Sequence, residues 1–358
     1  MTDERGAGRP GRILTALLCA LTAAGLYGCS GPGPSEPSPT PTPTPATTVP
    51  APTPTPATTV PAPTPTPAAT APAPNGRSPF TGLPARPAPV LAVKLDNVPA
   101  ARPHTGLGAA DLVYVEQVEG GVTRLLAVYS SRLPELTGPV RSARESDIAL
   151  LADFGRPVLA YSGAQSALNP LLRAAPLDLV TETTTPRAFL RSPDRSAPHD
   201  LYLRPARALA AVPATQDARD IGFRFGPAPA GGRPVETSTV RYPAARYAFT
   251  WSAADRAWRV AMDGREARAT DTGPLTPETV VVQRVAVRPS RFHDRLGSVS
   301  PYSETIGSGT ALVLRDGRAY EARWSRPSAA SGTTFTTPSG APLPFAPGQT
   351  WIVLAPRT

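Results

Sequence analysis

Two arginines beside a predicted helix start carry the clearest chemical signal in the chain. Ser142-Ala143-Arg144-Glu145 matches a capping box, in which a hydroxyl and a carboxylate satisfy the backbone N–H groups that open a helix. Free N–H groups at that position favour anions, and arginine binds carboxylate or phosphate through two parallel hydrogen bonds. The pattern predicts an anion-binding site made of Arg141, Ser142, Arg144 and Arg124.

Acidic residues in the same part of the chain give these arginines a second interpretation. Glu116, Glu119 or Asp147 could hold them in a structural network of ion pairs. Cations beside the positive end of a helix need a counter-anion, which comes either from such an acid or from a ligand. The sequence leaves both sources open.

Glu116 and Glu119 are also the residue types of an acid–base pair, as in glycoside hydrolysis. Residues three apart on a strand point to opposite faces, so these carboxylates converge only if Glu119 lies in a turn after the strand. A hydrolase that acts on a cell-wall polymer through the two acids and the nearby arginines is the alternative function.

His199 is a further catalytic candidate, because Asp200 follows it and a carboxylate can orient an imidazole as a general base. Neighbours in sequence rarely form that hydrogen bond, and a structural histidine fits the pattern as well. His104 and His293 stand alone, and three scattered histidines lack metal-ligand spacing. We therefore expect no metal site and no cofactor.

Strand and helix patterns alternate around these residues, which favours an α+β or α/β fold with a partly parallel sheet. The expected strands are residues 90–95, 112–116, 125–129, 158–161 and 177–180, and the expected helices are one that starts near Ser142, 170–174 and 205–212. The sequence thus predicts an N-terminal mixed α/β domain over residues 78–216.

The pattern changes after a stretch rich in Gly and Pro, residues 217–234, which is the predicted boundary. Aromatic residues alternate with smaller ones between residues 247 and 262. Asp263-Gly264 and Asp316-Gly317 are signals for hairpin turns. Residues 235–358 are therefore predicted to form a smaller, mainly antiparallel β region.

The beginning of the chain has the pattern of a bacterial export signal. Three arginines precede an apolar stretch at residues 13–26, which is shorter than the about 20 residues that span a membrane. Leu26-Tyr27-Gly28-Cys29 resembles a lipobox. We predict that residues 1–28 are a signal peptide and that Cys29 is lipidated, with palmitate among its acyl chains. Cys19 leaves with the signal peptide.

A segment rich in proline and threonine follows the lipidated cysteine. Residues 31–77 contain 17 prolines and 12 threonines, and an 11-residue unit recurs within them. Such a segment has little to bury, so residues 29–77 are predicted to form a disordered stalk. At about 3.1 Å per residue in polyproline II, the stalk would reach roughly 140 Å.

The formal net charge of +9 limits the choice of partners. An exported protein meets lipid head groups and acidic wall polymers, so nucleic acid is not expected. Lys94 is the only lysine among 36 basic residues, and this arginine bias is also typical of a high-GC genome.

Several runs together resemble the YerB-like lipoproteins, a bacterial family built on a domain of unknown function (number 3048) with an N-terminal and a C-terminal part. The matching runs are Pro79-Phe80-Thr81-Gly82, Leu95-Asp96-Asn97, Ala110 to Tyr114, Val118 to Arg124, Gly138 to Arg144 and Ala197 to Tyr202. The C-terminal part matches more loosely, through Asp263-Gly264 and residues 347–352. Asp200 stands where the family pattern has Asn. The resemblance implies a location and a two-part architecture, but no reaction.

These observations predict a membrane-anchored protein on the extracytoplasmic face of the cell membrane. We expect a non-enzymatic module that binds a cell-wall polymer or an envelope protein, with the membrane as a partner through the lipid anchor.

Overall fold

The computed structural model describes residues 76–212 and 215–357. The predicted signal peptide, Cys29 and nearly all of the predicted stalk lie outside the described residues. Within the described part, no helix is long and apolar enough to span a membrane.

One mixed sheet of 11 strands forms the centre of the structure. Its strands from the N-terminal part are β1 (Leu91–Leu95), β2 (Leu112–Gln117), β3 (Thr123–Tyr129), β4 (Val158–Ala160) and β5 (Asp178–Val180). Those from the C-terminal part are β8 (Arg233–Pro234), β15 (Thr279–Val285), β18 (Gly307–Arg315), β19 (Arg318–Arg326), β20 (Thr334–Thr336) and β21 (Thr350–Pro356).

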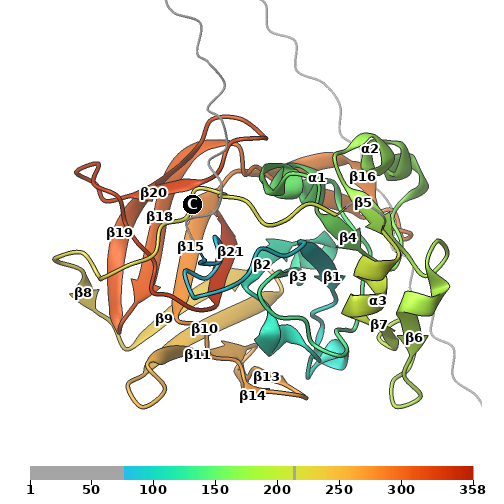
Figure 1. Cartoon of the computed structure of the whole chain (residues 1–358), viewed down its shortest axis with the longest axis horizontal. Coiled ribbons are helices and arrows are strands. Elements are labelled where there is room, and N and C mark those ends of the chain that lie inside the picture. Colours follow the sequence, from blue (N-terminus) through green and yellow to red (C-terminus); the bar gives the residue numbers. More distant parts are fainter. Residues whose placement is uncertain (1–75, 213–214, 358) are drawn as a thin grey trace, which may run out of the picture. The chain divides into compact units, whose positions relative to one another are not determined.

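The order in this sheet is β20-β19-β18-β15-β21-β2-β3-β1-β4-β5, with β8 beside β19. β1 and β4, β4 and β5, β2 and β21, and β15 and β21 pair in parallel. The predicted mixed N-terminal fold and its partly parallel sheet are confirmed. Because β2 pairs with β21, the two parts predicted from the sequence share one sheet (Figure 1).

The remaining strands form smaller antiparallel sheets. One has four strands, β9 (Thr237–Tyr242), β10 (Ala245–Ser252), β11 (Ala257–Met262) and β12 (Arg265–Glu266). The two-stranded sheets are β6 (Phe189–Arg191) with β7 (Leu201–Leu203), β13 (Arg268–Ala269) with β14 (Gly273–Pro274), and β16 (Val287–His293) with β17 (Val299–Ser303). The antiparallel C-terminal region is thus confirmed.

Three short helices lie beside the β1–β4–β5 end of the main sheet (Figure 1): α1 (Glu145–Leu151), α2 (Asn169–Ala174) and α3 (Pro205–Ala210). The predicted cap of the first helix is wrong, because α1 begins at Glu145 rather than near Ser142. Arg144 is the residue before the helix, and its N–H donates to the Asp147 carboxylate at 2.7 Å. Before it, the chain runs along another segment, since Ala143 N donates to the Gly163 carbonyl and Ser162 N donates to the Arg141 carbonyl, each at 3.0 Å.

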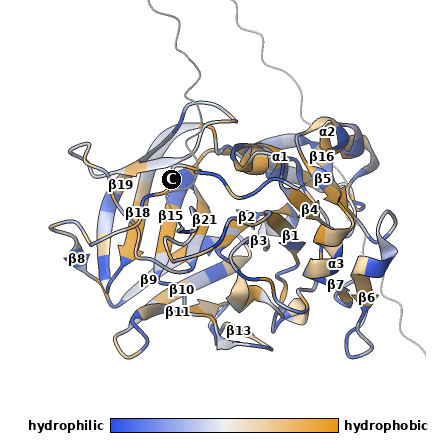
Figure 2. Ribbon diagram, viewed as in Figure 1, coloured by the Kyte–Doolittle hydropathy of each residue, from blue (hydrophilic) through white to orange (hydrophobic). Residues whose placement is uncertain are grey.

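Alternating side chains of the main sheet enter two separate cores, as the two-residue period of a strand requires. Leu91 and Val93 join a core that contains Tyr247 and Trp258 of the four-stranded sheet. Side chains on the opposite face of the sheet, such as Ala92, belong to a second core that contains residues of α1 and α2. Figure 2 shows hydrophobic residues along the central strands of the main sheet. The sheet is therefore buried on both faces. Its packed strands hold their ends in fixed positions, and the polar residues of the candidate site lie at these ends.

Candidate functional site

A polar cleft of about 1110 Å³ opens where β1, β3 and the segment before α1 meet. Ten ionisable residues line it, namely four acids, four arginines and two histidines: Asp96, Glu119, Glu145, Asp294, Arg124, Arg141, Arg144, Arg295, His199 and His293. We call it the arginine cleft. It contains all four residues of the predicted anion site, Ser142 included.

Backbone hydrogen bonds bring distant parts of the chain together at the cleft. The segment that contains Arg141 lies beside the end of β1, since Arg141 N donates to the Lys94 carbonyl at 2.8 Å and Asp96 N donates to the Pro139 carbonyl at 2.9 Å. On its other side, Val140 N donates to the carbonyl of Leu201 in β7, at 2.7 Å. Asp96, Arg141 and the loop before β7 are held together in this way.

A glycine turn between β2 and β3 places Glu119 on the cleft wall. Gly120 and Gly121 both have positive φ, at 67° and 71°. A Cβ atom at Gly121 would lie 2.5 Å from the Cβ of Pro243, so a side chain does not fit there. The two glycines therefore form a tight turn that orients the carboxylate of Glu119.

The β16–β17 hairpin contributes the C-terminal part of the cleft wall. Phe292, Leu296 and Ser300 line the cleft, and the Ser300 hydroxyl donates to the Glu119 carboxylate. The cleft thus includes residues from both halves of the sequence, which motif reasoning on the N-terminal half alone could not foresee.

Arg144 forms the structural ion pair that the sequence left open. Its Nε and Nη2 atoms donate to the two carboxylate oxygens of Glu119 at 2.6 and 2.8 Å. Burial opposes the ionisation of Glu119, but the hydrogen bonds from Arg144 and Ser300 outweigh it and lower its pKa. Glu119 is therefore held as an anion and has its counter-ion in place.

Arg124 is a cation with few local partners. Its side chain is nearly buried, and it donates one hydrogen bond, from Nη1 to the Ser142 carbonyl at 2.8 Å. No carboxylate lies within ion-pair distance of it among residues 76–212 and 215–357. Burial, together with repulsion from Arg144 and Arg141, lowers its pKa to about 10.

Arg141 leaves its guanidinium available to the cleft. Its Nε atom lies 3.2 Å from the Asp96 carboxylate without the geometry of a hydrogen bond, and its side chain is 28% exposed. The Nε atom itself is buried, but neither Nη atom of Arg141 forms a hydrogen bond or ion pair within the described part of the chain. Of the three arginines, Arg141 is therefore the one best placed to bind a ligand.

Glu116 does not line the arginine cleft, unlike Glu119. It lies in the interior, where Lys94 donates to Glu116 at 2.8 Å and to Asp147 at 2.6 Å. Burial first, and then repulsion from Asp147, raise the pKa of Glu116 to about 7, although Lys94 opposes this shift. The structure thus separates the two glutamates that the hydrolase alternative requires to converge.

His199 has a carboxylate partner, but that partner is Asp96. The Nδ1 atom of His199 lies 2.9 Å from the Asp96 carboxylate, although 103 residues separate the two in sequence. The neighbour Asp200 pairs instead with Arg191, at 2.9 Å. Sequence reasoning missed Asp96 in this role, and the only hint was its place directly after a buried strand.

The described residues contain no cluster of His, Cys, Asp and Glu that could hold a metal ion. His104 is buried, with its Nε2 atom 2.8 Å from the Asp96 carbonyl oxygen, and burial lowers its pKa to about 4. His293 is exposed on the hairpin. Neither histidine belongs to a group of potential metal ligands.

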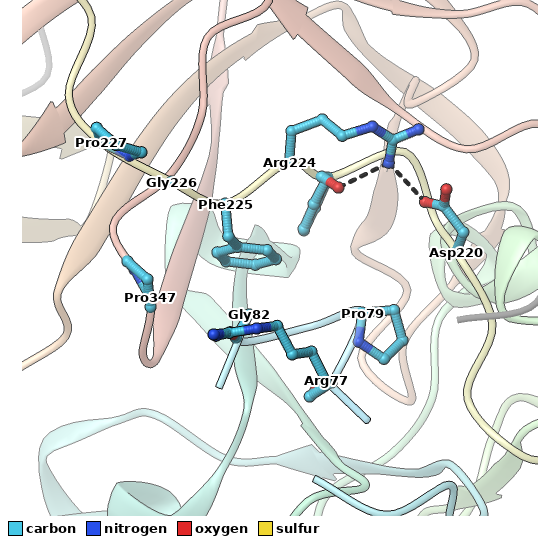
Figure 3. A pocket seen from close by; sticks show the side chains of 11 residues that line it. Arg77, Pro79, Gly82, Asp220, Arg224, Phe225, Gly226, Pro227 and Pro347 are labelled. Carbon is cyan, nitrogen blue, oxygen red and sulfur yellow. Dashed lines mark hydrogen bonds and ion pairs between the residues drawn. The ribbon is translucent and has the colours of Figure 1, made fainter. Parts of the chain in front are cut away.

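A second cavity, of about 890 Å³, differs in character from the arginine cleft (Figure 3). Prolines and phenylalanines line much of it, and its charged pair, Arg224 and Asp220, lies 2.9 Å apart. Gly82 faces Phe225, and a Cβ atom at Gly82 would lie 2.4 Å from the Phe225 Cβ. Its other arginine, Arg77, donates to the Gly82 carbonyl at 2.7 Å, so both arginines that line this cavity have partners within its lining.

Comparisons with known proteins place the chain in a two-part family. Residues 80–219 match the N-terminal domain, and residues 238–352 the C-terminal domain, of the protein of unknown function DUF3048. The chain belongs to this YerB-like family, as the sequence motifs predicted.

Two comparisons, one of sequence and one of structure, are with YerB of Bacillus subtilis. Over 304 residues, the chain is 28% identical to the protein named "Putative lipoprotein YerB" of Bacillus subtilis (strain 168), with 78% of this chain and 86% of the relative covered. A crystal structure of YerB protein from Bacillus subtilis superposes with a TM-score of 0.67 at 23% identity, and covers 78% of this chain and 97% of that one. The second comparison shows that the fold is shared.

Proposed function

We propose that this protein is a lipid-anchored lipoprotein on the outer face of the cell membrane, and that its arginine cleft binds an anionic group of a cell-wall polymer or envelope protein. The anchor is supported by the lipobox-like run that ends at Cys29 and by the name of the Bacillus relative. The observation that carries the binding proposal is that the Nη atoms of the partly exposed Arg141 have no partner in the described part of the chain, although its Nε atom lies near Asp96.

The convergence of separate motifs supports the same cleft. Four of the runs that carry the family resemblance supply residues to it, namely those that contain Asp96, Arg124, Arg141 and His199. Their positions span about 100 residues of sequence, so local secondary structure alone does not explain why they meet. The backbone hydrogen bonds between β1, the segment that contains Arg141 and β7 bring them to one cleft, where a single ligand can contact Arg124 and Arg141.

Electrostatics favour an anionic ligand. Arg144 is paired with Glu119 and Arg141 lies 3.2 Å from Asp96, whereas Arg124 has no ion pair in the described part of the chain. A carboxylate or phosphate that reaches the Nη atoms of Arg141 would accept bidentate hydrogen bonds from them. Such charge-assisted hydrogen bonds contribute roughly 1.5–3 kcal/mol each.

The hydrolase alternative through Glu116 and Glu119 lacks comparable support. Glu116 is 1% exposed, and its carboxylate accepts from Lys94, whereas Glu119 is fully paired with Arg144 and Ser300. Neither carboxylate is free to take a proton from a substrate or a water in the cleft.

Affinity capture from envelope extract tests the binding proposal. The protein and its Arg141→Ala/Arg144→Ala variant are compared with Arg241→Ala/Arg246→Ala, which removes two exposed arginines from β9 and β10. We expect the cleft variant to lose its bound component and the control to retain it. Equal retention by both variants would show that net charge, and not the cleft, binds the component.

Fractionation tests the anchor separately. Radiolabelled palmitate should enter the protein but not a Cys29→Ser variant, and that variant should leave the membrane fraction. Identical fractionation of the two proteins would contradict lipidation at Cys29.

A further inference from the structure

Asp96 and His199 form a dyad at the arginine cleft that ligand binding alone does not use. Asp96 is almost buried, and one of its oxygens accepts the Asn97 N–H at 2.9 Å. The other oxygen lies 2.9 Å from Nδ1 of His199 and 3.2 Å from Nε of Arg141. The carboxylate is therefore fixed by the backbone on one side and faces the imidazole on the other.

This arrangement determines which ring nitrogen of His199 carries the proton. An ionised carboxylate can only accept hydrogen bonds, so Nδ1 is the donor, and Nε2 of the neutral ring keeps its lone pair. Nε2 has no hydrogen-bond partner among the residues that the structure describes, and the His199 side chain is 20% exposed. A base with a fixed orientation and a free lone pair thus lies at the cleft, beside a guanidinium.

The other two histidines of the chain do not share this geometry. Nε2 of His104 contacts the Asp96 carbonyl oxygen, and the ring is buried. His293 contacts the carbonyl oxygen of Asp294 through Nδ1, and no carboxylate lies within ion-pair distance of it in the described part of the chain. The pairing of a histidine with a buried acid is therefore specific to His199.

We propose that His199 is a general base for the hydrolysis of carboxylic esters in the arginine cleft, with Asp96 as its positioning residue and Arg141 as the group that stabilises the oxyanion. The proposal goes beyond binding. It shares the cleft and Arg141 with the proposed function, but an ester need not carry the anionic group that the arginines bind.

The reaction needs only water as the co-reactant. Nε2 takes a proton from a water molecule as the water oxygen attacks the carbonyl carbon, and the carbonyl electron pair moves to the oxygen, where Arg141 faces the new negative charge. The C–O bond to the alcohol then breaks as the oxyanion collapses. Nε2–H returns the proton to the leaving alkoxide, so the products are a carboxylic acid and an alcohol. Asp96 stabilises the imidazolium in between.

Hydrolysis of p-nitrophenyl acetate by the full-length protein tests the proposal, with His199→Asn as the test variant and His293→Asn as the matched control in the same cleft. General base catalysis contributes about 100-fold or more, so His199→Asn should lower kcat by at least that factor, and His293→Asn should change it less than twofold. Thermal unfolding of each variant checks that the fold is intact.

Asp96→Asn separates positioning from simple structural support. It should lower kcat at least tenfold and leave KM within twofold, because the ester does not contact Asp96. A change in KM alone, with kcat retained, would contradict the positioning role.

Equal rates of hydrolysis by wild type and His199→Asn would overturn the proposal. So would a wild-type rate no higher than the rate in buffer alone. The probe is uncharged, so its hydrolysis does not depend on anion binding. Failure of this test leaves the binding proposal standing, and failure of the capture experiment leaves this one standing.

Discussion

Two charged clusters begin at the end of the same strand, and they differ in how completely their charges are satisfied. Lys94 and its two partners, Glu116 and Asp147, are at most 1% exposed. Two residues further on, Asp96 faces Arg141 and His199, whose side chains are 28% and 20% exposed. The first cluster is closed to solvent, whereas the second opens into the cleft.

The difference separates stability from function. In the buried cluster, every charge has a partner and no ligand can enter, so removal of one group leaves a charge stranded in the interior. In the cleft, Arg141 and His199 keep nitrogen atoms without a protein partner in the described part of the chain. Substitutions in the first cluster should therefore change folding, and substitutions in the second should change binding.

The largest effect on stability is expected for Lys94→Met. It removes the cation between two buried carboxylates, and loss of one partner of a buried ion pair costs about 3–5 kcal/mol. Urea unfolding at pH 7 measures the loss. A change below 1 kcal/mol would mean that the buried cluster is no more critical than a surface pair.

The pH dependence of stability should identify Glu116 within the buried cluster. Its pKa is raised from the ordinary 4.5 to about 7 by burial, so between these values the folded chain holds a proton that the unfolded chain has lost. Stability contributed by this group is therefore lost as pH rises through that window. Glu116→Gln does not titrate, so its unfolding free energy should rise relative to wild type between pH 4.5 and 7.

The difference in unfolding free energy between wild type and Glu116→Gln isolates the contribution of Glu116 to the pH dependence. His104 and Asp153, whose pKa values burial moves to about 4 and about 7, are present in both proteins and cancel in the difference. A difference between wild type and Glu116→Gln that stays constant with pH would contradict the assignment.

A smaller effect should distinguish the two arginines of the cleft. Arg144→Ala removes a bidentate partner of Glu119 and should lower the unfolding free energy by roughly 1.5–3 kcal/mol. Arg141→Ala should change it by less than about 1 kcal/mol, since Arg141 is partly exposed and Asp96 keeps its other partners. Denaturant unfolding of both variants checks this order, and the reverse order would make Arg141 the structural residue.

The smallest effect is expected for Asp200→Asn, which introduces the residue of the family pattern. Asp200 pairs with Arg191, whose side chain is 51% exposed, and exposed pairs contribute about 0.2–1 kcal/mol. Unfolding free energy and the hydrolysis rate should both stay close to wild type. A large loss of activity would show that His199 depends on its neighbour in sequence after all.

Local patterns were enough to predict much of the fold. The strands β1, β2 and β3 came from apolar runs, and the hairpin turns at Asp263 and Asp316 came from the following glycines, since both aspartates have positive φ. The pairing of β2 with β21 was not predictable, because parallel strands more than 200 residues apart carry no local signal of their partnership.

The candidate site was predictable in its residues but only partly in its pairings. Arg124, Arg141, Ser142 and Arg144 do line one cleft. Short-range reasoning placed the helix start near Ser142, but the backbone is still extended at Arg144, with φ −129° and ψ 164°, and α1 begins at Glu145. It also considered only Asp200 as a carboxylate partner for His199, because the contact with Asp96 depends on three segments that meet only in the folded chain.

Equilibrium binding of inorganic polyphosphate to Arg141→Ala and Glu116→Gln tests the central claim most directly, because each substitution affects one of the two clusters. The account predicts that Arg141→Ala binds at least tenfold more weakly, a loss of about 1.4 kcal/mol, with nearly wild-type stability. It predicts that Glu116→Gln binds within twofold of wild type although its stability changes. Equal affinities for Arg141→Ala and wild type, or a tenfold loss in Glu116→Gln alone, would contradict the assignment of binding to the arginine cleft.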